Sequence, residues 1–119
     1  MKFGSVFAAT VLVLVSGAAS AQDNAPAGNA KASQQVYKAI GCWECHGTMG
    51  QGGAVTGPRL APTKMPYAAF LQQLRVPQNA MPPYEAKILS NADAANIYAF
   101  LKSVPEAKSV QEIPLLSND

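Results

Sequence analysis

The segment Gly41-Cys42-Trp43-Glu44-Cys45-His46-Gly47 constrains this chain more than any other feature of its sequence. Cys42 and Cys45 are the only cysteines among 119 residues, and His46, which follows directly, is the only histidine. A disulfide between cysteines three positions apart closes almost no loop and would stabilise the protein little. The two cysteines are therefore better explained by chemistry at the thiols than by cross-linking.

The pattern C-x-x-C-H is typical of covalent haem attachment. Two thiols on one short turn can form thioethers with the two vinyl groups of one porphyrin, and His46 then lies under the iron. A thioredoxin-like C-x-x-C belongs near a βαβ pattern, which this sequence lacks. A zinc site needs four ligands, and a carboxylate would have to complete the set here. We therefore predict one haem c, held by Cys42, Cys45 and His46.

The first 21 residues have the features of a secretory signal peptide. Lys2 gives a positive start, an apolar run follows at residues 6–15, and Ala19-Ser20-Ala21 supplies a small-x-small cleavage pattern. We expect cleavage after Ala21 and therefore a periplasmic location. An uncleaved segment would instead anchor the protein in a membrane.

The second axial position of the iron must hold a methionine, another weaker ligand or nothing, because the chain has no histidine besides His46. Met1 is lost when the signal peptide is cleaved, and Met49 lies too close to His46 in sequence to reach the opposite face of the haem. Met65 and Met81 remain as candidates. Met81 precedes two prolines that restrict φ and prevent a helix. We favour Met81, because a stiff loop holds its thioether in a fixed position relative to the haem. Met65 is expected to fill space in the core or to lie in a loop.

Residues 31–104 are predicted to form one all-α domain, because no segment has the alternation of a strand. The expected helices cover residues 31–40, 67–76 and 91–104. Ser90 caps the last helix and Pro105 ends it. Glycines and prolines predict loops at residues 47–66 and 77–83, a flexible leader at 22–30 and no regular pattern in the tail, 105–119.

The charge of the chain is nearly balanced, with nine Lys and Arg against seven Asp and Glu. No cluster of basic residues is present, so nucleic acid is not an expected partner. A net charge this small also predicts weak electrostatic steering of any protein partner.

Taken in order, these segments resemble class I cytochromes c, which carry a single haem. The similarity rests on the first helix, the C-x-x-C-H segment, Gly57-Pro58-Arg59-Leu60, Met81-Pro82-Pro83-Tyr84 and a last helix containing Ile97-Tyr98-Ala99-Phe100-Leu101. It runs from residue 31 to residue 104, which is most of the mature chain. The resemblance implies a cytochrome c-like fold, with small helices and loops wrapped around the haem.

The resemblance also assigns roles to individual residues. It implies Cys42 and Cys45 as thioether donors, His46 as the proximal ligand and Met81 as the distal ligand. It further implies that the Pro58 carbonyl accepts the second ring N–H of His46, which fixes the tautomer of a ligating histidine.

The family crosses its first and last helices. Here the crossing would pack Val36, Tyr37 and Ile40 against Ile97, Phe100 and Leu101. Tyr37 stands five residues before Cys42, where many members have an aromatic residue four before, and Gly41 looks like the extra residue.

Several other side chains are expected near the haem. Trp43 is expected to pack, and Arg59 and Arg75 either meet the haem propionates or lie in solvent. The apolar face of the middle helix is expected to line the haem with Tyr67, Phe70, Leu71 and Leu74.

Ligation by His46 and Met81 would raise the reduction potential and leave no open position on the iron. We therefore expect a one-electron carrier, not an enzyme, with a donor such as a periplasmic dehydrogenase and an acceptor such as an oxidase or another cytochrome. The arrangement also resembles small cytochrome subunits of periplasmic dehydrogenases. Two other classes stay open: a fixed subunit of an oxidoreductase complex that docks through residues 109–119, or a gas- or peroxide-binding haem protein if Met81 is absent or labile.

Overall fold

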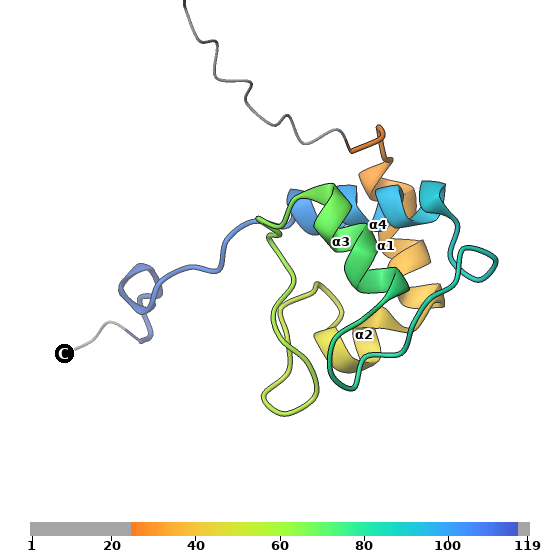
Figure 1. Ribbon diagram of the computed structural model, residues 1–119. Helices are drawn as coiled ribbons and strands as arrows, with labels where there is room; N and C mark the ends of the chain where they lie inside the picture. The colour runs from red at the N-terminus through yellow and green to blue at the C-terminus, as the bar shows by residue number, and fades with distance from the viewer. Residues whose placement is uncertain (1–24, 117–119) are drawn as a thin grey trace, which may run out of the picture.

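The computed structural model describes residues 25–116, which fold into helices joined by long loops (Figure 1). The helices are α1 (Ala30–Ala39), α2 (Cys42–His46), α3 (Tyr67–Arg75), α4 (Asn91–Ser103) and the 3₁₀ turn η1 (Val110–Glu112). These residues contain no strand, only an isolated bridge between Gly53 and Gly57. The prediction of an all-α fold is therefore confirmed.

The predicted signal peptide, residues 1–21, lies outside the described residues. Within residues 25–116, no helix combines the length and the apolar character needed to cross a bilayer.

Helix α1 begins inside the segment predicted to be a flexible leader. The side chain of Asn29 accepts two backbone N–H groups of the first turn, which makes it the N-cap. Its own N–H donates to the Asn96 side chain on α4 at 3.0 Å. Gly28 packs so closely on α4 that a Cβ there would lie 2.6 Å from the Ala95 carbonyl oxygen. Residues 28 and 29 are thus part of the packed domain.

Ser90 caps α4 as predicted. Its hydroxyl oxygen accepts the backbone N–H of Asp93 at 3.0 Å. The same hydroxyl donates to the Asp93 carboxylate at 2.8 Å, so the two side chains fix each other at the start of the helix. The helix ends at Ser103, two residues before Pro105, which cannot continue it.

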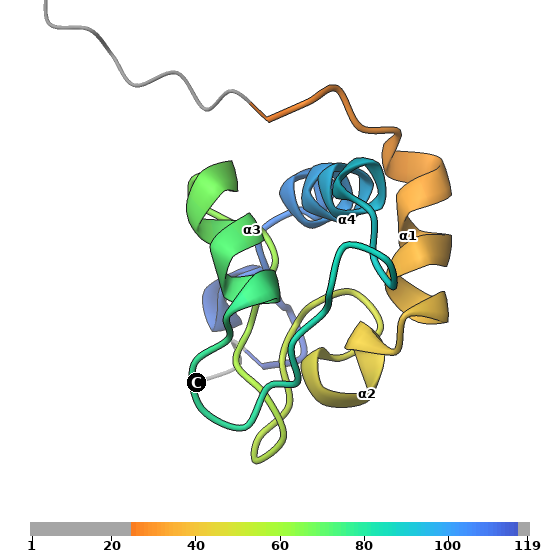
Figure 2. The same ribbon diagram turned by 45° about the vertical axis from the view of Figure 1, so that its right-hand side comes forward.

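The core forms where α1 crosses α4, as the resemblance implied. Figure 2 shows α4 between α1 and α3, and α4 packs against both helices. Tyr37 of α1 is fully buried, and its ring lies 5.3 Å from the Phe100 ring on α4. Gly41 absorbs the extra residue between α1 and α2 by taking φ = 85°, a left-handed conformation that glycine adopts without strain.

The loops place α2 and α3 around one space below the helix crossing. The carbonyl oxygen of Gly50 accepts the N–H groups of Leu60 and Ala61 at 2.8 and 2.9 Å, which folds the first loop back on itself. The N–H of Tyr84 donates to the Leu74 carbonyl at 2.8 Å and holds the second loop against α3. Together these bonds close the walls of a cavity.

Candidate haem site

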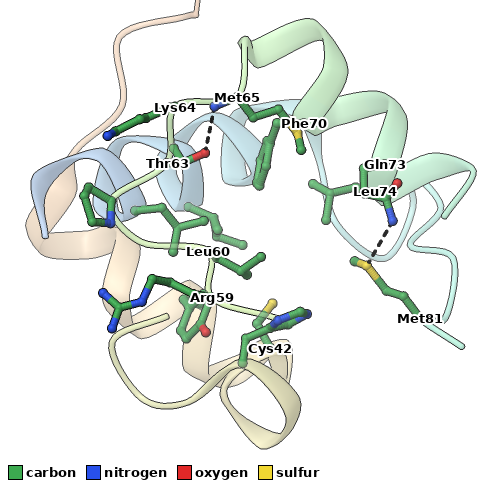
Figure 3. A pocket seen from close by; sticks show the side chains of 15 residues that line it. Cys42, Arg59, Leu60, Thr63, Lys64, Met65, Phe70, Gln73, Leu74 and Met81 are labelled. Carbon is green, nitrogen blue, oxygen red and sulfur yellow. Dashed lines mark hydrogen bonds between the residues drawn. The ribbon is translucent and has the colours of Figure 1, made fainter. Parts of the chain in front are cut away.

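A cavity of about 340 Å³ lies between α2, α3, α4 and the two loops (Figure 3). Its volume is within the range of small-molecule and cofactor sites, roughly 300–1,000 Å³. Its apolar walls come from elements far apart in the sequence: Tyr37, Leu60, Phe70, Leu74, Ile97 and Leu101. Cys42, His46 and Met81, three of the predicted haem-binding residues, border the same space together with Met65, whereas Cys45 and Pro58 do not.

The two cysteines occupy different positions on α2. Cys42 is buried and borders the cavity, whereas Cys45 is exposed, and the two are not joined in a disulfide. Burial raises the pKa of the Cys42 thiol to about 11. A thiol that stays protonated at neutral pH differs from the low-pKa cysteine of redox-active C-x-x-C motifs. Among the residues the structure describes, no group of three or more His, Cys, Asp or Glu side chains is arranged to hold a metal.

His46 has a fixed orientation. Its Nδ1 lies 2.9 Å from the Pro58 carbonyl oxygen. A carbonyl oxygen can only accept, so Nδ1 carries the proton and Nε2 is the nitrogen left to bind a metal. The structure thus contains the contact that the resemblance implied for Pro58.

Gly57 makes this approach possible, although its sequence position predicted no role of its own. A Cβ at Gly57 would lie 2.9 Å from Nδ1 and 3.0 Å from Cε1 of His46. It would also lie 2.9 Å from the Cys45 carbonyl oxygen. Only a residue without a side chain lets the loop come this close to the imidazole. A glycine directly before Pro58 was the available sequence signal.

Met81 and Met65 both border the cavity but differ in their surroundings. Met81 is half-buried and packs against the core, whereas Met65 is 43% exposed. The amide nitrogen Nε2 of Gln73 lies 3.8 Å from the Met81 sulfur. The better-packed thioether is therefore that of Met81.

Arg75 fixes the loop that carries Met81. One guanidinium nitrogen donates to the Tyr84 carbonyl and another to the Asn91 side-chain oxygen, each at 2.6 Å. This clamp differs from both roles considered from the sequence, a propionate contact or a solvated side chain. Arg59, in contrast, is exposed and borders the cavity.

Two expectations for apolar side chains need correction. Phe70 and Leu74 border the cavity, but Tyr67 and Leu71 do not. Tyr67 is instead buried in an aromatic cluster, with its ring 5.3 Å from that of Tyr98. Trp43 is 43% exposed rather than packed, whereas Cys42, the residue before it on α2, is buried.

A family model described as cytochrome C oxidase, cbb3-type, subunit III, matches residues 28–101, more than half of the chain. The chain belongs to this family. As a member of the cbb3-type subunit III family it has a c-type cytochrome domain, which binds haem c covalently through the C-x-x-C-H arrangement. The match starts at Gly28, which packs closely on α4. No curated protein and no solved structure matches the chain.

The residues around the cavity fit this cofactor. An inward-facing thiol, an imidazole with one free nitrogen and a thioether border one apolar space, which is the donor set of a c-type haem with His/Met ligands. The prediction of one covalent haem c is confirmed by the family. A domain of this kind carries electrons between redox partners.

Proposed function

We propose that the protein is an exported one-electron carrier whose haem iron is bound by His46 and Met81. The observation that carries the proposal is that both side chains border the same apolar cavity. Met81, in contrast to Met65, is packed against the core and sits in a loop clamped by Arg75.

When bound, the haem supplies an iron that gains or loses one electron. The Pro58 carbonyl keeps the proton of His46 on Nδ1 and so leaves Nε2 as the ligand. The neutral thioether of Met81 favours ferrous over ferric iron, and the apolar walls penalise the additional charge of the ferric state. The clamped loop keeps the thioether in place in both states. These residues therefore favour a relatively high potential and little rearrangement during electron transfer.

The edge of the site at α2 is where a redox partner can approach. Cys45 and Trp43 are both exposed there, directly beside the buried Cys42. A donor such as a periplasmic dehydrogenase and an acceptor such as an oxidase or another cytochrome would exchange electrons across this edge through a small, transient contact.

The ligation is tested by absorption spectra of the haem-loaded protein, oxidised and reduced, with and without carbon monoxide. We expect a low-spin spectrum that carbon monoxide leaves unchanged. Met81→Ala should open the iron to carbon monoxide while the haem stays attached, and Met65→Ala, the matched control, should behave as the unmodified protein. A carbon monoxide shift in the unmodified protein would favour the gas- or peroxide-binding alternative, and an unchanged Met81→Ala spectrum would exclude Met81 as the ligand.

The periplasmic location rests on residues 1–21, and it is tested separately. Mass spectrometry of the exported protein should give a chain that begins at Gln22. A chain that retains Met1 and sediments with membranes would contradict cleavage and support a membrane anchor.

A second candidate function is that of a fixed subunit in an oxidoreductase complex. The family description refers to an oxidase subunit. The tail after α4 extends away from the helices in Figure 1, and Val110, Leu115 and Leu116 are 54%, 88% and 59% exposed. Copurification with other subunits that is lost when residues 106–119 are removed would favour this role. Purification of the full chain alone would favour the carrier.

A further inference from the structure

Gln73 is a polar residue on the face of α3 that borders the cavity. It follows Phe70 by three positions and precedes Leu74, and all three side chains line the cavity. Residues three and four apart share one face of a helix, so an apolar side chain would be expected at this position. Figure 3 shows the Gln73 amide directed at the Met81 thioether, with the nitrogen 3.8 Å from the sulfur.

Gln72 provides the contrast on the same helix. It is exposed and borders an outer groove beside residues 76–78, but not the cavity. Gln73 is half-buried and borders both spaces, so its amide lies in the wall between the cavity and the outside. The two neighbouring glutamines therefore differ in whether they reach the thioether.

The contact between Gln73 and Met81 has a defined donor and a defined acceptor. A thioether sulfur can only accept, so the amide of Gln73 must donate an N–H and present the positive end of its dipole to the sulfur. Such a bond withdraws electron density from the sulfur and makes it a weaker donor to iron. The positive end of the N–H dipole and the weaker donation from the sulfur both disfavour the additional positive charge of ferric iron. The apolar surroundings strengthen both effects. Hydrogen bonds of this kind around metal ligands tune reduction potentials.

We propose that Gln73 is a positioning residue for Met81, and that its amide N–H raises the reduction potential of the haem by donating to the ligating sulfur. The inference rests on the ligation by Met81 proposed above. Gln73 would thus set the reduction potential of the haem together with Met81.

The test compares the midpoint potentials of four haem-loaded proteins: unmodified, Gln73→Leu, Gln73→Glu and the control Gln72→Leu. Gln73→Leu removes the donor and should lower the potential, by up to about 59 mV for a tenfold change in the one-electron equilibrium. Gln73→Glu keeps the shape but places an anion that cannot donate beside the sulfur, and it should lower the potential further. Gln72→Leu should leave the potential unchanged.

The ferric charge-transfer band of the thioether ligand separates an electronic role of Gln73 from a structural one. A lower potential in Gln73→Leu with the band retained reports the lost N–H donor, whereas a lower potential with the band lost reports a displaced Met81. The anion of Gln73→Glu lowers the potential by its charge alone, so the donor role is decided by Gln73→Leu. If Gln73→Leu matches the Gln72→Leu control, the donor role is wrong.

The ferric charge-transfer band of a thioether ligand keeps this result apart from the proposed ligation. The band should be present in the unmodified protein and absent from Met81→Ala. If it is absent from the unmodified protein, the proposed ligation fails, and the inference fails with it. If the band behaves as expected but the potentials of the position-73 variants do not change, only the inference about Gln73 fails.

Discussion

Gly57→Ala tests whether the close approach of the loop to His46 controls the stability of the site. The added Cβ would lie 2.9 Å from Nδ1 of His46, whereas ordinary contacts begin at 3.4 Å. The loop and α2 must therefore separate by about 0.5 Å. The bond between Nδ1 and the Pro58 carbonyl, now 2.9 Å, would lengthen beyond the usual limit of about 3.2 Å.

The cost follows from two contributions. Overpacking of this kind costs about 1–3 kcal/mol, and the weakened hydrogen bond costs about 1 kcal/mol more. We expect Gly57→Ala to lose about 2–4 kcal/mol of unfolding free energy. For a domain of this size the midpoint of thermal unfolding should fall by about 10 °C or more.

The assay is thermal unfolding of the haem-loaded protein, followed by circular dichroism. Val55→Ala is the control, because Val55 lies in the same loop and is 96% exposed. Its effect should stay within about 0.5 kcal/mol. A midpoint for Gly57→Ala equal to that of Val55→Ala would refute the steric argument, since the loop would then have room for the Cβ.

Three further predictions concern other parts of the domain. Arg75→Lys keeps the charge but loses the forked contact with the loop, so the free energy of unfolding should fall by about 1.5–3 kcal/mol. The freed loop should also increase the affinity of the ferric protein for imidazole. An unchanged imidazole titration would contradict the role of Arg75 in holding the loop. Phe100→Ala should lower the free energy of unfolding, measured with denaturant, by about 3–5 kcal/mol, because Phe100 is buried against Tyr37. A loss as small as that of Val76→Ala, at an exposed position, would contradict this. Hydrogen bonds from the side chain and the backbone of Ser109 lower the pKa of Glu112 below its ordinary value. The tail turn is therefore stabilised while Glu112 is ionised, and it loses this support as the pH falls through the lowered pKa. The Ser109 amide resonance should shift at strongly acidic pH, and an invariant resonance would count against the turn.

Much of the site was predictable from the sequence, because its chemistry is encoded locally. The spacing of Cys42, Cys45 and His46 specifies covalent haem attachment within one short turn. A single histidine in the chain restricts the second ligand to a methionine or a weaker group. The periodicity of apolar residues located the three longer helices to within one or two residues at each end, since a helix places residues three and four apart on one face.

The path of the loops was decided only by the tertiary structure. The contact between Gly57 and His46, the clamp of Arg75 and the exposure of Met65 all depend on how residues 47–66 and 77–89 run between the helices. Loops rich in glycine and proline have no periodicity from which to infer their neighbours. For the same reason the sequence showed Gln73 only as one of two adjacent glutamines, and packing alone brought one of them to the Met81 sulfur. Residue type and local spacing thus specify the cofactor, whereas the long-range contacts that position and tune its ligands arise only when the chain closes around the cavity.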